Sequence, residues 1–163
     1  METPAYSGIE QFDIAIRFDG TWTHQGVPMT RMPLVRLFAS ILRRDAAGDY
    51  WLITPVERGR IVVEDAPFIA VAWRREGDVL FLTDNLGRET PVDATCPLAL
   101  RVPRGGTGPA VPYHQLPGGV EARLNTSVYY DLIDLALREG VPDAAGLLHL
   151  TSGGVPHPLG EAA

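Results

Sequence analysis

The chain has 163 residues, of which 45% are hydrophobic and 21% are charged. This balance is typical of one average globular domain, or of two very small ones that pack on each other. The net charge is −6, and the acidic residues are spread along the chain without a basic arm. Duplex DNA and anionic membranes require clustered positive charge, so the composition argues against both as partners.

All 14 basic residues are Arg, which excludes a Schiff-base or P-loop lysine mechanism. Two explanations of this bias stay open: the codon usage of a GC-rich genome, or planar recognition of phosphate or carboxylate. Cys96 is the only cysteine, so neither a disulfide nor a thiolate zinc cluster can form within the chain. The first ten residues lack the layout of a signal peptide, and no apolar run is long enough to span a membrane. We therefore expect a cytoplasmic protein.

The N-terminal part of the chain predicts two β hairpins. Apolar residues alternate with polar or small ones over 12–18, which is the period of a half-buried strand. Asp19-Gly20 favours a tight turn, after which 21–24 returns as the second strand. A second hairpin is expected from 50–56 and 60–64.

A helix is expected between these hairpins. Pro33 suits its first turn, with Thr30 or Arg31 as the cap. Arg43 and Arg44 would lie in its last turn, where they suit the helix dipole. The expected apolar stripe consists of Leu34, Leu37, Phe38, Ile41 and Leu42.

The C-terminal part repeats the order hairpin, helix, hairpin. Its expected strands are 111–115, 120–124, 147–151 and 155–159. Asn125 or Thr126 would cap the helix, which carries an Asp134–Arg138 pair and buries Val128, Leu132, Leu135 and Ala136. Between the two parts, a β meander is expected from 68–73, 79–83, 88–93 and 98–102.

The spacing of these elements indicates a duplication. Gly20 and Gly119 lie 99 residues apart, and Gly59 and Gly153 lie 94 apart. The predicted fold class is α+β, with two small, mainly antiparallel β domains, each with one packing helix. The expected domains are 1–76 and 77–163, and the second would loosely resemble a pleckstrin-homology barrel.

Several features that suggest chemistry have simpler explanations. The Gly-rich segment 103–109 lacks the ending and the following helix of a phosphate-binding loop, so it is interpreted as a surface loop. Ser152 lies in a hairpin turn without a nucleophile elbow. No metal site is expected from the four histidines, which lack paired spacing and are His24, His114, His149 and His157.

The hairpin tip around Glu57 and Arg60 is a stronger candidate. It is either a solvated turn or a phosphate site in which Glu57 holds Arg60 in place. Glu64-Asp65 alone is far short of a divalent-cation site.

The two expected helix starts are a further candidate, with Arg31 beside one and Arg123 before the other. Helix N-termini favour anions, so two such ends facing one cleft would suit an anionic small molecule. The alternative is that both arginines flank caps on the surface. Tyr129 and Tyr130 cannot share one helix face, so one of them is available to a cleft or a neighbour.

The segment 33–68, with its Thr-Pro-Val-Glu and Val-Glu-Asp-Ala-Pro-Phe pieces, resembles the bacterial "domain of unknown function 1285" family. So do 97–102, 119–136 and the closing Ser-Gly-Gly and Pro-Leu-Gly of 152–160. The resemblance implies two domains related by duplication, a ligand site at their interface for a nucleotide-based molecule, and a role in signalling. The positions that it implies near this site are Arg31, Glu57, Arg60, Asp65, Arg123 and Tyr130.

Three functional hypotheses follow. The first is a non-catalytic ligand sensor, in which a small phosphate-bearing molecule bridges the domains and changes their packing. The second is a protein-interaction module that uses exposed strand edges or a concave sheet. The third is an enzyme with Glu57 and Asp65 as acid and base, which requires the two carboxylates to converge in one pocket. No cofactor is expected, and oligomeric state stays open.

Overall fold

The computed structural model describes residues 11–139, 143 and 145–161. Its N-terminal sheet has the order β3-β2-β1-β6-β5-β4, and within it β1 and β6 run parallel while the other pairs are antiparallel. The elements of this domain are β1 (Gln11–Ile16), β2 (Trp22–His24), β3 (Val27–Pro28), α1 (Met32–Ser40), β4 (Leu42–Arg44), β5 (Tyr50–Ile53) and β6 (Arg58–Val63).

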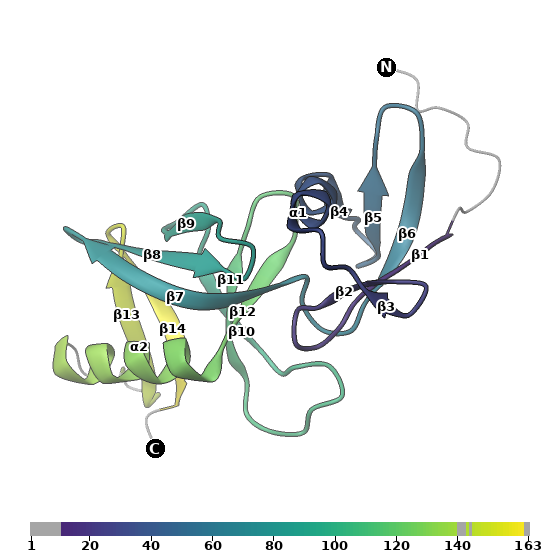
Figure 1. Cartoon of the computed structure of the whole chain (residues 1–163). Coiled ribbons are helices and arrows are strands. Elements are labelled where there is room, and N and C mark those ends of the chain that lie inside the picture. Colours follow the sequence, from purple (N-terminus) through teal and green to yellow (C-terminus); the bar gives the residue numbers. More distant parts are fainter. Residues whose placement is uncertain (1–10, 140–142, 144, 162–163) are drawn as a thin grey trace.

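The second sheet has the order β10-β11-β12-β7-β8-β9, again with one parallel pair, β12 with β7, at its centre. It consists of β7 (Phe68–Glu76), β8 (Val79–Asp84), β9 (Glu89–Val92), β10 (Leu98–Arg101), β11 (Val111–Gln115) and β12 (Glu121–Leu124). The helix α2 (Thr126–Glu139) and the hairpin of β13 (Leu147–Ser152) and β14 (Val155–Glu161) follow. In Figure 1 the two sheets lie side by side, α2 runs along β7, and α1 lies where the sheets meet.

The predicted α+β class with two mainly antiparallel domains is confirmed. The expected boundary after residue 76 falls at the end of β7, and β7 pairs with β8 and β12 of the second sheet. No described helix is long and apolar enough to cross a membrane.

The duplication is visible in the turns and in the sheets, in different ways. Residues 45–48 and 143–146 both read Asp-Ala-Ala-Gly, and in each the aspartate Oδ1 accepts backbone N–H groups two and four residues later. The hairpins of the first copy share one sheet, whereas β13 and β14 of the second form a sheet of their own. The two six-stranded sheets instead share a connectivity: two three-stranded meanders joined by a parallel pair of their first and last strands.

The expected end of the first helix was wrong. The helix ends at Ser40, no basic residue lies in its last turn, and the residues that it buries are Val35 and Ala39. Leu42 and Arg44 belong instead to β4, which pairs with β5. Apolar residues at the helix end also fit an edge strand, and the pairing with Leu52 and Tyr50 decided between the two. Arg31 occupies the N-cap position without a side-chain cap bond.

The second helix forms as expected. Asn125 Oδ1 accepts the backbone N–H of Val128 at 2.8 Å, which is an N-cap interaction. Val128, Leu132 and Ala136 are buried, and Leu135 is half-buried. Asp134 and Arg138 form the expected ion pair at 2.8 Å.

The β13–β14 hairpin is held on the second sheet by buried polar groups. The Ser152 hydroxyl donates to the Val92 carbonyl at 2.6 Å and accepts the Leu80 N–H at 2.7 Å. His157 Nδ1 accepts the Leu98 N–H at 3.3 Å, and burial lowers the pKa of this imidazole. A Cβ at Gly153, where φ is +61°, would lie 2.8 Å from Asp93 Cβ, so the turn approaches the sheet as only glycine allows. Ser152 is therefore a structural residue that joins β8, β9 and the hairpin.

Replacing Ser152 with Ala is expected to lower the free energy of unfolding by about 1–3 kcal/mol, because it leaves a buried N–H and a buried carbonyl without their partner. Ser127→Ala on the exposed start of α2 is the matched control, with an expected change within about 0.5 kcal/mol. Urea unfolding of both variants measures the difference. Equal stabilities would contradict the bridging role.

Candidate functional site

Two of the predicted site residues, Asp65 and Arg123, meet at the junction between the domains. Asp65 follows β6 in the connection to β7, and only 1% of it is exposed. Its Oδ1 accepts Arg101 Nη1 and the Arg104 backbone N–H, each at 2.9 Å. Its Oδ2 accepts the Tyr113 hydroxyl and Arg123 Nη1, each at 2.7 Å. Every donor to this carboxylate comes from the C-terminal domain.

Arg101 and Arg123 each make further contacts beyond Asp65. Arg101 also contacts Glu121 at 2.6 Å and lies over the Tyr113 ring, 3.8 Å from its centroid. Arg123 donates to the Phe18 carbonyl at 2.8 Å and lies 3.9 Å above the Phe18 ring. The network of Asp65, Arg101, Arg123 and Tyr113, hereafter the junction network, therefore ties the turn after β1 to β10, β11 and β12.

The junction network favours an ionised Asp65. Burial alone would raise the pKa of this carboxyl, but hydrogen bonds from Arg104, Tyr113, Arg123 and Arg101 outweigh burial, so the pKa is lowered. Burial, followed by the bond to Asp65, raises the pKa of Tyr113. Both carboxylate oxygens are fully engaged, so Asp65 lacks a free position from which to take or give a proton.

The other four predicted residues lie apart from the junction network. Arg60 on β6 pairs with Asp49 at 3.5 Å and lies 5.0 Å from the Trp51 ring centroid. Arg31 stands at the start of α1, and Tyr130 is 64% exposed on α2. Glu57 lies in the exposed turn between β5 and β6. The structure shows no contact of these four with Asp65 or Arg123, and the carboxylates of Glu57 and Asp65 do not converge.

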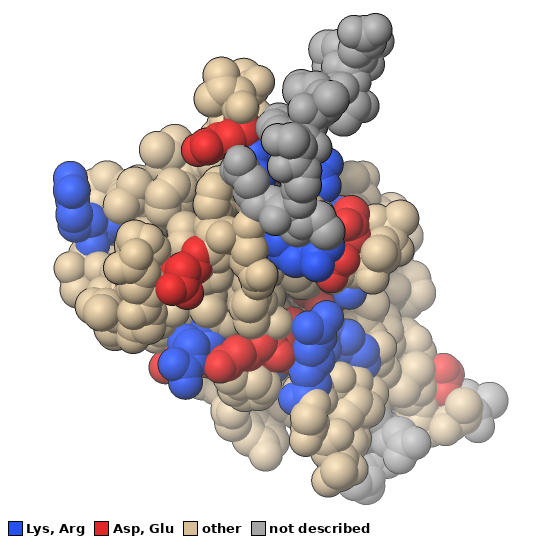
Figure 2. All heavy atoms as spheres, turned by 90° about the vertical axis from the view of Figure 1, so that its right-hand side faces the viewer, with Lys and Arg blue, Asp and Glu red and all other residues tan. Residues whose placement is uncertain are grey.

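Positive and negative side chains are mixed on the face of the molecule that the N-terminal domain presents in Figure 2. Figure 2 shows Arg side chains beside Asp and Glu on this face, in place of a continuous basic patch. Arg17 pairs with Glu64 at 2.9 Å. Three or more His, Cys, Asp or Glu side chains that could hold a metal ion do not gather anywhere in the part of the chain that the structure describes.

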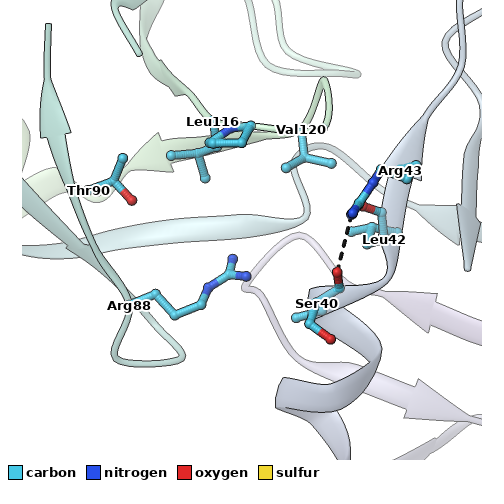
Figure 3. Close-up of a pocket in the computed structure, with 10 residues that line it drawn as sticks. Ser40, Leu42, Arg43, Arg88, Thr90, Leu116 and Val120 are labelled. Carbon is cyan, nitrogen blue, oxygen red and sulfur yellow. Dashed lines mark hydrogen bonds between the residues drawn. The ribbon is translucent and has the colours of Figure 1, made fainter. Parts of the chain in front are cut away.

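A cavity of about 350 Å³, hereafter the seam cavity, lies between the two domains. The N-terminal domain lines it with the end of α1 and β4, and the C-terminal domain with the β8–β9 and β11–β12 turns. The lining residues are Ala39, Ser40, Leu42, Arg43, Arg88, Thr90, Leu116, Pro117, Gly118 and Val120. In Figure 3 the Arg43 and Arg88 side chains extend into it from opposite domains, with Leu116 and Val120 above.

The two guanidinium groups are only partly engaged. Arg43 Nη1 donates to the Leu42 and Ser40 carbonyls at 2.7 and 3.2 Å. Arg88 Nε contacts Asp84 Oδ2 at 2.9 Å, and the Arg88 guanidinium lies 4.1 Å from the Phe68 ring centroid. Asp84 is buried behind Arg88, and the lining residues include no carboxylate. The N–H groups that remain on both arginines therefore give this cavity a positive character.

Two contacts across the domains frame the seam cavity. The Arg44 backbone N–H donates to the Gly118 carbonyl at 3.2 Å, and Arg36 Nε donates to the Leu86 carbonyl at 3.0 Å. The sequence predicted Arg43 on a helix and a hairpin of 111–115 and 120–124, and it gave no sign that the two meet. The lining segments are distant in the chain, and only the docking of the domains brings them together.

Replacing Asp65 with Asn is expected to lower the free energy of unfolding by about 3 kcal/mol, because Arg123 and Arg101 would lose their shared counter-charge. The lowered pKa means that the stabilisation from Asp65 is present above about pH 4 and is lost as the pH falls through the native-state value. The difference between wild type and variant should therefore narrow below about pH 4. Urea unfolding across pH measures this. Asp78→Asn in the β7–β8 turn is the control, and an equally small effect of both substitutions would contradict the assignment.

Comparisons with known proteins agree on one family. The family description "Domain of unknown function (DUF1285), N-terminal domain" matches residues 3–66, and "Protein of unknown function (DUF1285), C-terminal domain" matches residues 67–159. No curated protein matches the chain.

Two crystal structures are similar to this chain. A DUF1285 family protein from Silicibacter pomeroyi DSS-3 is 35% identical with a TM-score of 0.82, over 94% of this chain and 82% of that one. A DUF1285 family protein from Shewanella baltica OS155 is 28% identical with a TM-score of 0.62, over 76% of this chain and 91% of that one. Because the two family domains together cover residues 3–159, this chain belongs to the DUF1285 family.

Proposed function

We propose that the protein is a cytoplasmic, non-catalytic sensor that binds a small anionic molecule in the seam cavity. The observation that supports this function is the pair of guanidinium groups, Arg43 from one domain and Arg88 from the other, at a cavity without a lining carboxylate. Arginine binds phosphate and carboxylate groups through planar, paired hydrogen bonds. Phosphate-bearing molecules, with nucleotide-based ones first among them, are the ligand class that we propose.

The rest of the cavity supports an organic ligand over a bare ion. Its volume of about 350 Å³ lies in the range of small-molecule sites. Ala39, Leu116, Pro117 and Val120 supply apolar surface, and Ser40 and Thr90 supply hydroxyl groups. A ligand with an anionic group and an apolar body would contact both kinds of surface at once.

The position of the cavity supports a regulatory role. A ligand held by Arg43 and Arg88 would bridge the domains beside the Arg44–Gly118 contact. A ligand that binds one arrangement of two domains better than another shifts the population toward it. We therefore propose that binding changes how the domains pack, and that this change is the signal.

A nucleotide that binds the seam cavity is expected to stabilise the native protein by about 2.7 kcal/mol at 100 times its dissociation constant. Thermal unfolding with inorganic phosphate and a panel of nucleoside mono-, di- and triphosphates measures this. Arg43→Gln and Arg88→Gln should each weaken binding at least about tenfold, the loss typical of a charge-assisted contact. Arg31→Gln, outside the cavity, is the control.

Two outcomes would reject the proposed function. One is the absence of stabilisation by any member of the panel at millimolar concentration. The other is stabilisation that Arg31→Gln reduces as much as Arg43→Gln and Arg88→Gln do.

A further inference from the structure

We propose that a second cavity, inside the N-terminal domain, binds a small organic amine whose apolar part packs on the cavity floor and whose ammonium group pairs with Glu57. This cavity, hereafter the N-domain cavity, has a volume of about 350 Å³ and shares no lining residue with the seam cavity. It opens between the first sheet and α1. The proposal is therefore independent of the function proposed above.

The floor of the N-domain cavity is apolar and comes from several elements. It consists of Phe12, Ile14, Phe38, Ile41 and Leu52. A Cβ at position 59 would lie 2.3 Å from the Phe12 ring, so Gly59 allows this ring to lie directly against β6. Phe12, Phe38 and Ile41 are only partly buried, so the floor keeps apolar surface that a ligand can cover. Covering such surface is the main favourable term for an apolar ligand.

Glu57 contributes an unpaired carboxylate to the cavity lining. The turn that carries it is ordered by Thr54, whose Oγ1 accepts the Glu57 N–H at 3.0 Å and donates to the Glu57 carbonyl. The Glu57 carboxylate itself makes no hydrogen bond or ion pair with a described residue, and no arginine lines the cavity. An unpaired carboxylate beside apolar surface favours a cation that also carries an apolar group.

His24 and Asp13 also line the N-domain cavity. His24 is paired with Ile14 in the β1–β2 register, so both side chains lie on the cavity side of the sheet. An imidazole there offers a hydrogen bond to the ligand. Alternation along β1 places the Asp13 side chain on the opposite face from Phe12 and Ile14, so the charge at the cavity comes from Glu57.

The charge of the N-terminal residues argues for a separate molecule as the occupant. Residues 1–10, which precede Gln11 in the chain, read Met-Glu-Thr-Pro-Ala-Tyr-Ser-Gly-Ile-Glu. Their side chains include two carboxylates and no basic group, so these side chains supply no cation for Glu57. A free amine with one aromatic or branched apolar group has the matching charge and a size that the cavity accommodates.

Three probes with one ring system and different charges test the proposal on the full chain: tryptamine, the neutral alcohol tryptophol, and indole-3-acetate. Amide chemical shifts of the labelled protein are followed during titration up to about 10 mM, which covers dissociation constants near 1 mM. Tryptamine is expected to give saturable shifts at residues of β1, α1 and the β5–β6 turn. Tryptophol should bind the same residues about fivefold more weakly, the ratio that about 1 kcal/mol for an exposed ion pair gives.

Glu57→Gln should reduce the affinity for tryptamine to that for tryptophol and leave tryptophol binding unchanged. Asp78→Asn removes one negative charge from the C-terminal domain and should change neither the affinity for tryptamine nor that for tryptophol. Equal affinities of wild type for tryptamine and tryptophol, or tryptamine binding that survives Glu57→Gln, would overturn the proposal. So would saturable shifts that fall only on other residues, or none at all. Chemical-shift changes that indole-3-acetate causes at seam-cavity residues would report binding to the seam cavity. They fall on different residues from those of the N-domain cavity, so the two sites can be followed separately.

Discussion

The structure depends on one buried carboxylate between two domains. The Asp65 carboxylate accepts four hydrogen bonds, and all of them come from groups of the C-terminal domain. Burying an ion costs several kcal/mol of free energy unless each of its lone pairs accepts a hydrogen bond. Displacing the donors of the C-terminal domain from Asp65 would therefore be unfavourable. Arg123 also donates to the Phe18 carbonyl, so the same guanidinium holds the turn after β1. Together with the Arg44–Gly118 and Arg36–Leu86 contacts, this contact holds one sheet against the other beside the seam cavity.

The seam cavity is a product of that docking and belongs to neither domain alone. Its two arginines are held by neighbours of their own domain: Arg43 by the Ser40 and Leu42 carbonyls, and Arg88 by Asp84. Each guanidinium thus keeps its position while part of its donor capacity faces the opposite domain. The geometry of such a site would change with the packing of the domains, and this is why we propose a regulatory role for it.

Local patterns predicted most of the fold. The alternation in β1, the turns and the cap of α2 at Asn125 are short-range properties that the sequence displays directly. The end of α1 was misjudged because Ile41 and Leu42 suit a helix stripe and an edge strand equally, and the pairing of Leu42 with Leu52 is a tertiary contact. The repeated Asp-Ala-Ala-Gly turns at 45–48 and 143–146 were visible in the sequence and would have supported the duplication.

The candidate site was harder to predict, for an electrostatic reason. Asp65 and Arg123 were placed near a ligand site because the family resemblance implied them there and because Arg123 precedes a helix start. They instead neutralise each other across 58 positions of the chain. Arg43 and Arg88 could not be chosen, because nothing in the local sequence indicates that β4 and the β8–β9 turn will face one cavity. Composition identifies the arginines, and only the fold separates those that are engaged from those that keep free donors.

The order of synthesis gives the junction network a further consequence. Asp65 leaves the ribosome well before Arg101, Tyr113 and Arg123, so the N-terminal domain emerges with its last carboxylate still without partners. Domains generally fold as units from the N-terminus during translation, but the partners that fix Asp65 in this connecting segment belong to the second domain and are synthesised later. A ribosome that stalls between residues 66 and 101 would hold a nascent chain whose first sheet is complete in sequence and unanchored at its end.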